Sequence, residues 1–212
     1  MLKRVIGYLI IFGAIIGIAN RQIINKGIIS NVSRFGTTVQ VEKGAKHSQQ
    51  NTSVPLEGYK WPSKDITIAV TSTDPRTIKA FNDAINAWNS TGIINFVRTD
   101  HDQNADIVAN DTDLSADDQS NGIVETEELG VTSASYNRNT KILNHATSSI
   151  DINKLANSSE QYRMWVAEHE LGHAIGLAHA KENDDSVMVP TNPKTGITSN
   201  DINSVKELYD QK

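Results

Sequence analysis

Hydrophobic residues follow two different patterns along the chain. Residues 5–19 form an unbroken apolar run, whereas from residue 59 onward apolar residues recur with the periods of strands and helices. The stretch between them, residues 20–58, is polar and shows neither period, as is typical of a linker or a pro-segment. The pattern therefore predicts a leader over residues 1–19, a linker or pro-segment over 20–58, and one folded domain over 59–212.

The apolar run has the features of an export signal. It follows the basic residues Lys3 and Arg4 and ends in Gly17-Ile18-Ala19, where small residues suit a signal peptidase. It is shorter than the ~20 residues that span a bilayer comfortably, although its apolar neighbours could extend it into an uncleaved anchor. A cleaved signal and a membrane anchor through residues 5–19 both stay open, and a buried core helix is disfavoured because the run has no polar face. Both open alternatives predict a secreted or cell-surface domain.

Within the folded domain, alternating apolar and polar residues predict five strands, and apolar residues at helical spacing predict two helices. The first helix starts with Asp74 as N-cap and Pro75 at the first helical position, and Gly92 ends it. The second runs from the capping-box sequence at Ser158 to Gly176. The predicted strands lie near residues 66–70, 93–97, 105–109, 130–136 and 142–152.

Composition narrows the chemistry available to this domain. The 38% hydrophobic and 21% charged content is that of a globular protein. The 20 basic and 25 acidic residues give a net charge of −5, which argues against nucleic acid as a partner because such binding needs a basic surface. The chain has no cysteine, which excludes disulfides, thiolate metal sites and a cysteine nucleophile. Catalysis would have to use histidines, carboxylates, hydroxyls or a metal that they hold.

The second predicted helix carries a metal-binding motif. His169 and His173 are four residues apart, so their side chains lie on one helix face and can reach the same ion. Glu170 lies about 100° further round the helix, where it can address a water on that ion without ligating it. Gly176 can end the helix in a left-handed conformation, so that His179 returns as a third ligand. Three histidines leave a fourth zinc position open to water, as a hydrolytic site requires.

The motif from His169 to His179, with Met188 nine residues later, resembles that of the metzincin zinc endopeptidases and their Met-turn. Within that clan the chain is most similar to the matrixins. Weaker matches extend over residues 59–209: 59–62 before the first strand, Ala87-Trp88 at a helix end, 105–107 in a strand, and a closing helix from Thr198 to Tyr209.

The resemblance implies an α+β fold of the α/β metzincin type. It predicts a twisted, mostly parallel five-stranded sheet with an antiparallel edge strand, two main helices plus a C-terminal helix, and an active-site cleft with a Met-turn. It also implies one catalytic zinc on His169, His173 and His179, Glu170 as general base and acid, and Met188 as an apolar floor beneath the ligands. The chain lacks the histidine-rich insertion that holds a second zinc in related domains and the cysteine with which matrixin pro-segments block the metal.

The resemblance further implies where a substrate binds. The strand around residues 130–136 is expected to be the sheet edge, with unpaired backbone groups to which an extended peptide adds antiparallel. Trp165 occupies the position that lines the pocket for the side chain after the cleaved bond, although core packing is an equally open role for it. The predicted substrate-binding residues are Gly130, Val131, Thr132, Ser133, Trp165, Val166 and Pro190.

Other polar residues give weaker signals. His47, His101 and His145 are expected to be ordinary histidines rather than ligands. The seven carboxylates between Asp100 and Asp118 make a Ca²⁺ site conceivable by resemblance, but they lack an EF-hand pattern and are better explained as a solvated loop. Ala180 and Asn192 replace the serine and tyrosine that matrixins commonly have there, and neither position is catalytic.

Together these observations predict a monomeric zinc metalloendopeptidase that acts on extracellular proteins or peptides. One alternative is a zinc-stabilised cell-surface binding module without catalysis, which Glu170 argues against because a structural site needs no such carboxylate. A zinc hydrolase acting on a small non-peptide substrate is a second alternative. The natural substrate, and whether residues 20–58 inhibit the enzyme, do not follow from the sequence.

Overall fold

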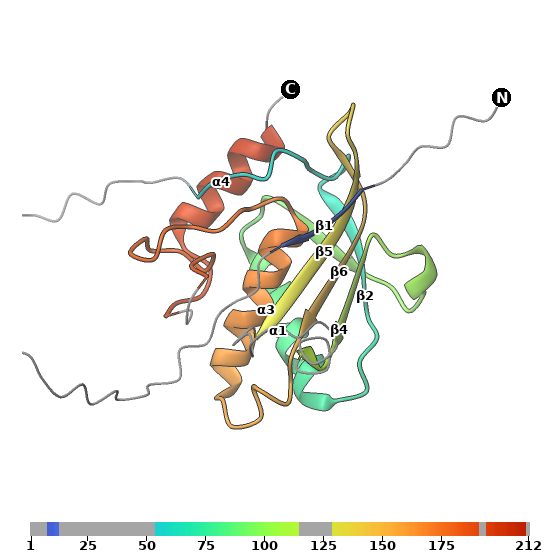
Figure 1. Cartoon of the computed structure of the whole chain (residues 1–212). Helices are drawn as coiled ribbons and strands as arrows, with labels where there is room; N and C mark the ends of the chain where they lie inside the picture. The colour runs from blue at the N-terminus through green and yellow to red at the C-terminus, as the bar shows by residue number, and fades with distance from the viewer. Residues whose placement is uncertain (1–7, 13–53, 115–128, 191–193, 211–212) are drawn as a thin grey trace, which may run out of the picture. The chain divides into compact units, whose positions relative to one another are not determined.

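A mixed β-sheet forms the centre of the domain (Figure 1). The computed structural model describes residues 8–12, 54–114, 129–190 and 194–210. Within these residues the sheet order is β1-β5-β6-β4-β2-β3. The strands are β1 (Tyr8–Phe12), β2 (Asp65–Val70), β3 (Asn95–Arg98), β4 (Ile107–Asp111), β5 (Gly130–Asn137) and β6 (Ile142–Ile150).

The five strands from β2 to β6 confirm the predicted sheet. β3, β2, β4 and β6 run parallel to one another, and β5 pairs antiparallel with β6. The parallel neighbours require crossover connections, and helix α1 (Pro75–Ser90) makes the one between β2 and β3. A single 3-10 turn, Asp102–Asn104, precedes β4.

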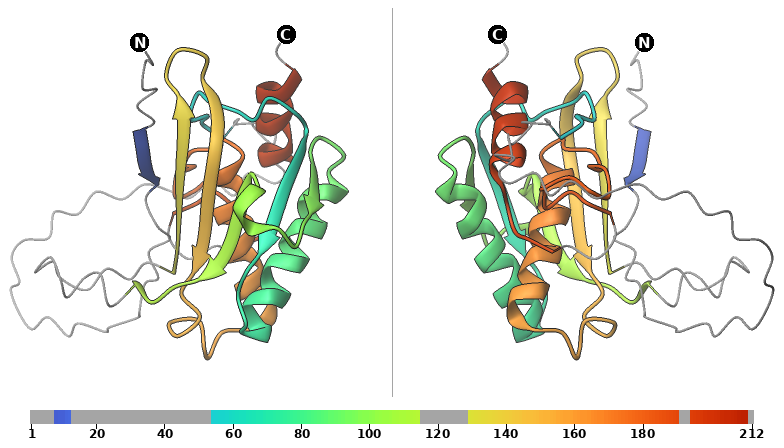
Figure 2. Two further views of the ribbon diagram at one scale, coloured as in Figure 1. Left: turned by 90° about the vertical axis from the view of Figure 1, so that its right-hand side faces the viewer. Right: turned by 90° about the vertical axis from the view of Figure 1, so that its left-hand side faces the viewer.

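Two long helices cover the same face of the sheet (Figure 2). Helix α3 (Glu160–Ala174) packs against β5, β6 and α1, and α1 packs against β3 and β4 as well. The core between these layers contains Phe81, Ile85 and Trp88 from α1, whose helical spacing puts them on one apolar face. A third helix, α4 (Ser199–Asp210), closes the described chain, as the resemblance implied.

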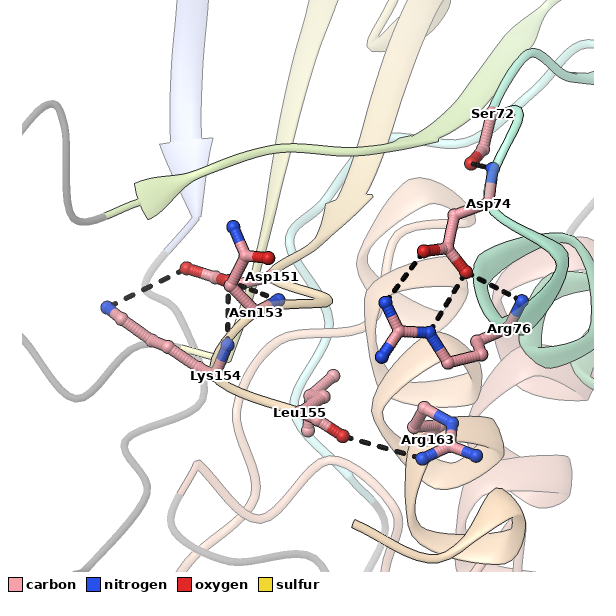
Figure 3. A network of polar contacts seen from close by, with 8 residues as sticks. All are labelled: Ser72, Asp74, Arg76, Asp151, Asn153, Lys154, Leu155 and Arg163. Atoms are coloured by element: carbon pink, nitrogen blue, oxygen red, sulfur yellow. Dashed lines mark hydrogen bonds and ion pairs between the residues drawn. The ribbon is translucent and has the colours of Figure 1, made fainter. Parts of the chain in front are cut away.

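The start of α1 and the connection into α3 are fixed by local polar contacts (Figure 3). Asp74 caps α1 by accepting the Arg76 backbone N–H at 2.8 Å, and it also pairs with the Arg76 side chain. This pairing lowers the pKa of Asp74 to about 2. Asp151, fully buried after β6, accepts the backbone N–H groups of Asn153 and Lys154 at 3.0 Å. Helix α1 thus starts where its capping residue predicted it.

The packed unit includes residues that precede the predicted domain start. Val54 is buried in the core, Leu56 forms a β-bridge with Leu177, and Ala178 donates its N–H to the carbonyl of Pro55 at 2.8 Å. Residues 54–58 therefore pack against the segment that follows α3.

Strand β5 was expected to have an unpaired outer edge, and the structure differs. β5 is the last of the five strands from β2 to β6, but its outer edge pairs antiparallel with β1. The register sets Tyr8 opposite Tyr136 and Phe12 opposite Thr132. The expectation that this edge is unpaired therefore does not hold in this structure. β1 belongs to the apolar run for which a signal or an anchor was predicted, and apolar, β-branched residues suit strand pairing. Within the described residues, no helix combines the length and hydrophobicity needed to cross a membrane.

Candidate metal centre

Helix α3 carries His169, Glu170 and His173 and then turns sharply. The turn is a Schellman motif, in which Gly176 donates to the carbonyl of His173 and Leu177 to that of Gly172, both at 3.0 Å. Gly176 has φ +104°, and a Cβ there would lie 2.4 Å from the carbonyl oxygen of Tyr59. Glycine is required for both reasons, and the turn carries the chain back to His179.

The carbonyl groups left free at the end of α3 find side-chain donors. Trp61 donates its indole N–H to Ala174 at 2.9 Å, and Tyr209 donates its hydroxyl to Ile175 at 3.1 Å. The chain segments before β2 and at the end of α4 therefore hold this turn in place.

Three histidine side chains converge beside this turn. The Nε2 atom of His173 lies 3.1 Å from Nε2 of His169 and 3.1 Å from Nε2 of His179. The Nδ1 atoms of His169 and His173 lie 2.7 Å from the carbonyl of Val187 and 2.9 Å from that of Leu177. A carbonyl can only accept, so these contacts put the ring proton on Nδ1 and leave both Nε2 lone pairs unprotonated.

This donor set fits a metal ion. Neutral histidines with Nε2 facing one point are zinc ligands, and carbonyl acceptors on the other ring nitrogen are their usual partners. Burial lowers the pKa of His169 to about 3 and also lowers that of His173, with a further contribution from the neighbouring histidines. Both rings are thus neutral near pH 7, as ligation requires. Among the described residues, His169, His173 and His179 are the group of three side chains close enough to hold one ion.

Glu170 lies fully buried between α3 and β5. Its Oε2 atom is 2.7 Å from the hydroxyl oxygen of Thr132. Its Oε1 atom lies against Gly130, where a Cβ would approach it to 2.6 Å. The carboxylate is therefore bounded by two β5 residues that the sequence associated with substrate rather than with Glu170.

Met188 packs directly beneath the histidine-bearing helix. A Cβ on Gly172 would lie 2.4 Å from the Met188 sulfur, so the glycine allows this close approach. Met188 is fully buried and its N–H donates to the Ser186 hydroxyl at 2.9 Å. Asp201 of α4 fixes the same turn, because its buried carboxylate accepts hydrogen bonds from Ser186, Val187 and Thr198.

The residues predicted to bind substrate lie in different environments. Gly130, Thr132 and Val166 are buried, whereas Val131 and Ser133 on the opposite face of β5, and Pro190 after the Met-turn, are partly exposed. Trp165 is partly exposed too, and its indole lies close to Gly196, where a Cβ would approach Nε1 to 3.0 Å. Trp165 thus contacts the segment that follows the Met-turn.

Among the described residues, the other histidines and acidic residues are not part of the three-histidine cluster. His101 is exposed, the Nδ1 atom of His145 lies 3.3 Å from the carbonyl of Ala105, and His47 lies outside the described residues. Asp117 and Asp118 of the acidic loop also lie outside the described residues. The carboxylate of Asp106 in that loop accepts hydrogen bonds from the backbone N–H and the hydroxyl of Thr67, both at 2.8 Å.

Two further residues contribute to the site without a clear sequence signal. Ser148 of β6 places its hydroxyl 3.1 Å from that of Thr132. Glu168, next to the first histidine, accepts the Ile197 N–H at 3.2 Å, and burial, with the nearby Asp201, raises its pKa to about 7. A carboxylate at a buried helix position is unusual enough to be noticed in a sequence, but its partner lies 29 residues away.

Histidine nitrogens converging on one point, with a buried carboxylate on the same helix, are typical of metal-dependent hydrolases. A comparison with protein-family models matches residues 60–210 to the matrixins, the peptidase M10 family. This match spans well over half of the chain, and the chain belongs to the matrixin family. Membership implies a metallopeptidase, in a family that uses a catalytic zinc. No curated protein matches the chain.

Proposed function

We propose that this domain is a zinc-dependent endopeptidase that cleaves peptide bonds in extracellular proteins or peptides. The observation that carries the proposal is the cluster of three histidine Nε2 atoms, 3.1 Å apart in two pairs. Two of these histidines lie on the helix that carries the buried Glu170. Family membership supports the reaction class.

His169, His173 and His179 would hold one zinc ion. The bound ion would lower the pKa of a water molecule and polarise the scissile carbonyl. Glu170 would take the proton of that water as general base and deliver it to the leaving amine as general acid. Met188 and Gly172 would keep the helix at the spacing that the ligands need.

We propose that the substrate lies extended along β5. Strand addition to a sheet edge supplies backbone hydrogen bonds that do not depend on sequence. The antiparallel pairing of Tyr8–Phe12 with this strand supports the idea, because it is an example of an extended segment bound along the same edge. Val131 and Ser133, both partly exposed, are the side chains on β5 that a bound peptide would meet.

We also propose that the domain acts outside the cytoplasmic membrane. The support is the leader pattern, in which Lys3 and Arg4 precede the apolar residues 5–19. An export signal or an anchor would both put residues 54–210 on the outer side of the membrane.

The test of catalysis is a variant that keeps the metal and removes the base. Glu170→Ala should retain one zinc per chain and lose at least about 100-fold in kcat on a mixed peptide pool, since it removes proton transfer but no ligand. Chelation of wild type should abolish cleavage, and added zinc should restore it. Glu207→Ala, which removes an exposed carboxylate on α4, is the matched control. Near-normal turnover by Glu170→Ala contradicts the mechanism, and a zinc-loaded wild type that cleaves no peptide favours the binding-module alternative.

A further inference from the structure

The face of β5 that points at α3 contacts the Glu170 side chain. Thr132 and Glu170 are fully buried, and the Thr132 hydroxyl oxygen lies 2.7 Å from Oε2 and 2.9 Å from the backbone carbonyl of Glu170. Ser148, fully buried on the adjacent β6, lies 3.1 Å from the same hydroxyl. A short chain of polar groups therefore leads from β6 through β5 to the carboxylate.

The single proton of the Thr132 hydroxyl can be assigned by comparing its neighbours. A hydroxyl donates one hydrogen bond and accepts up to two, so only one of the three neighbouring oxygens receives the proton at a time. The Oε2 atom is the nearest of them and the only one that belongs to a carboxyl group. As general base this group would be ionised, with its charge shared by both oxygens, and hydrogen bonds to ionised acceptors are the stronger ones. The Ser148 hydroxyl can then donate to Thr132 and complete its bonding.

Gly130 restrains the other carboxylate oxygen. A Cβ at this position would lie 2.6 Å from Oε1 and 2.8 Å from Cγ of Glu170, so the carboxylate fills the space that glycine leaves open. Thr132 therefore binds one oxygen while the Gly130 backbone bounds the other. The two residues together leave the carboxylate a narrow range of orientations.

We infer that Thr132, supported by Ser148, is a positioning residue that holds Glu170 in the orientation needed for proton transfer. The inference rests on the proposed function, because it assigns a partner to the proposed general base. A general base has to lie within hydrogen-bond reach of the proton it removes, and small misplacements of a reacting group are costly. With Oε2 held on β5, proton transfer would use the other oxygen, Oε1. Thr132 itself does not contact the reacting atoms.

The experiment compares variants that differ by the hydroxyl alone. Thr132→Val keeps the size and branching of the side chain, and it should lower kcat by about 10- to 100-fold, the loss expected for one hydrogen bond to a charged group. KM should stay within about twofold, and zinc content should stay at one per chain. Thr132→Ser restores the donor and should stay within about threefold of wild-type kcat. Thr147→Val, on β6 beside Ser148, is the matched control for losing a hydroxyl from this sheet, and its kcat should not change.

Several outcomes would overturn the inference. Wild-type kcat in a zinc-loaded Thr132→Val would do so, and so would equal losses in the Val and Ser variants, which would indicate a packing role instead. If the Val variant does not fold, Thr132→Ala and Thr132→Ser make the same comparison. A wild-type protein that cleaves no peptide at all counts against the proposed function, whereas an active wild type with an equally active hydroxyl-free variant counts against Thr132 alone.

Discussion

At the scale of single residues, the end of α3 shows how backbone conformation places a side chain for chemistry. Gly176 is the residue that reverses the chain between His173 and His179, and it does so with a positive φ and in contact with the carbonyl of Tyr59. A side chain at this position meets both a conformational and a steric penalty. The geometry of the third histidine thus depends on a residue with no side chain.

This arrangement predicts that Gly176→Ala destabilises the domain strongly. The new Cβ would lie 2.4 Å from a backbone oxygen, which cannot move aside as a flexible side chain can. We expect a loss of about 3 kcal/mol or more in the free energy of unfolding, from strain at positive φ plus overpacking. Zinc affinity should also fall, because His179 follows the turn. Chemical denaturation and metal titration measure the two effects.

Gly92 provides the matched control for this prediction. It also has a positive φ, +71°, but a Cβ there would have no atom within 4 Å. Gly92→Ala should therefore cost only about 1 kcal/mol, the backbone preference alone, and should leave metal binding unchanged. Equal losses at the two positions would show that contact with Tyr59 contributes nothing.

At the scale of elements, capping residues predicted where the helices start more accurately than the apolar pattern predicted where the strands start. The Asp74 cap and Pro75 fixed the start of α1, and Ser159 caps α3 one residue beyond the predicted start of the capping box. β3 starts at Asn95 rather than at 93 because the chain is still leaving the turn at Gly92, although Ile94 is buried as an apolar strand residue would be. β4 starts at Ile107, since the backbone N–H of Asp106 donates to the Thr67 hydroxyl at 2.9 Å and not to the backbone of a neighbouring strand.

The candidate site was predictable to the extent that it lies on one helix. The spacing of the histidines and Glu170 predicted their common location, and the structure brings the three histidines together. The Thr132 contact with Glu170 joins residues 38 apart, and it depends on which face of β5 meets α3. A single sequence does not determine strand register or the packing of a helix on a sheet, so this contact could not be predicted.

The packing of Trp165 on the segment after the Met-turn leads to a prediction about specificity. Its indole lies beside Gly196, and Glu168 binds the next residue, Ile197, so α3 holds this segment at two adjacent points. If Trp165 also limits the depth of the pocket, Trp165→Ala should shift the preferred side chain after the cleaved bond from small or medium apolar residues toward longer ones. Profiling cleavage sites on a mixed peptide pool measures the shift.

A conservative variant separates the two roles of Trp165. Trp165→Phe keeps an aromatic ring against Gly196 and should show a smaller shift in cleavage preference than Trp165→Ala. The thermal stability of each variant is recorded alongside. An unchanged preference in Trp165→Ala, accompanied by a lower melting temperature, would assign Trp165 to packing and not to the pocket.

At the scale of the whole molecule, the role predicted for the apolar residues 5–19 and the pairing of Tyr8–Phe12 in this structure exclude each other. As an export signal or anchor these residues would be cleaved or held in the membrane, whereas in this structure Tyr8–Phe12 pairs with β5. The pairing covers the strand along which we propose that substrate binds, so a retained segment would compete with substrate for the same backbone groups. Removal of the leader or its insertion in a membrane would leave that edge open.

We therefore predict that the active protein outside the cytoplasmic membrane has either lost residues 1–19 or holds them in the membrane. The full-length chain is expressed in a bacterial host, the cells are fractionated, and the N-terminus of the product in each fraction is sequenced. A signal predicts a product that begins near Asn20 in the exported fraction, because the small residues Gly17-Ile18-Ala19 precede that bond. An anchor predicts the intact chain in the membrane fraction, with the domain accessible to added protease from outside.

Replacing Ile11 and Ile15 with lysine interrupts the apolar run and should keep the chain inside the cell in both cases. Intact, soluble and fully active wild-type chain in the cytoplasm would contradict the prediction. Intact, soluble chain there with low activity would contradict export too, and would favour pairing with β5 as the role of Tyr8–Phe12.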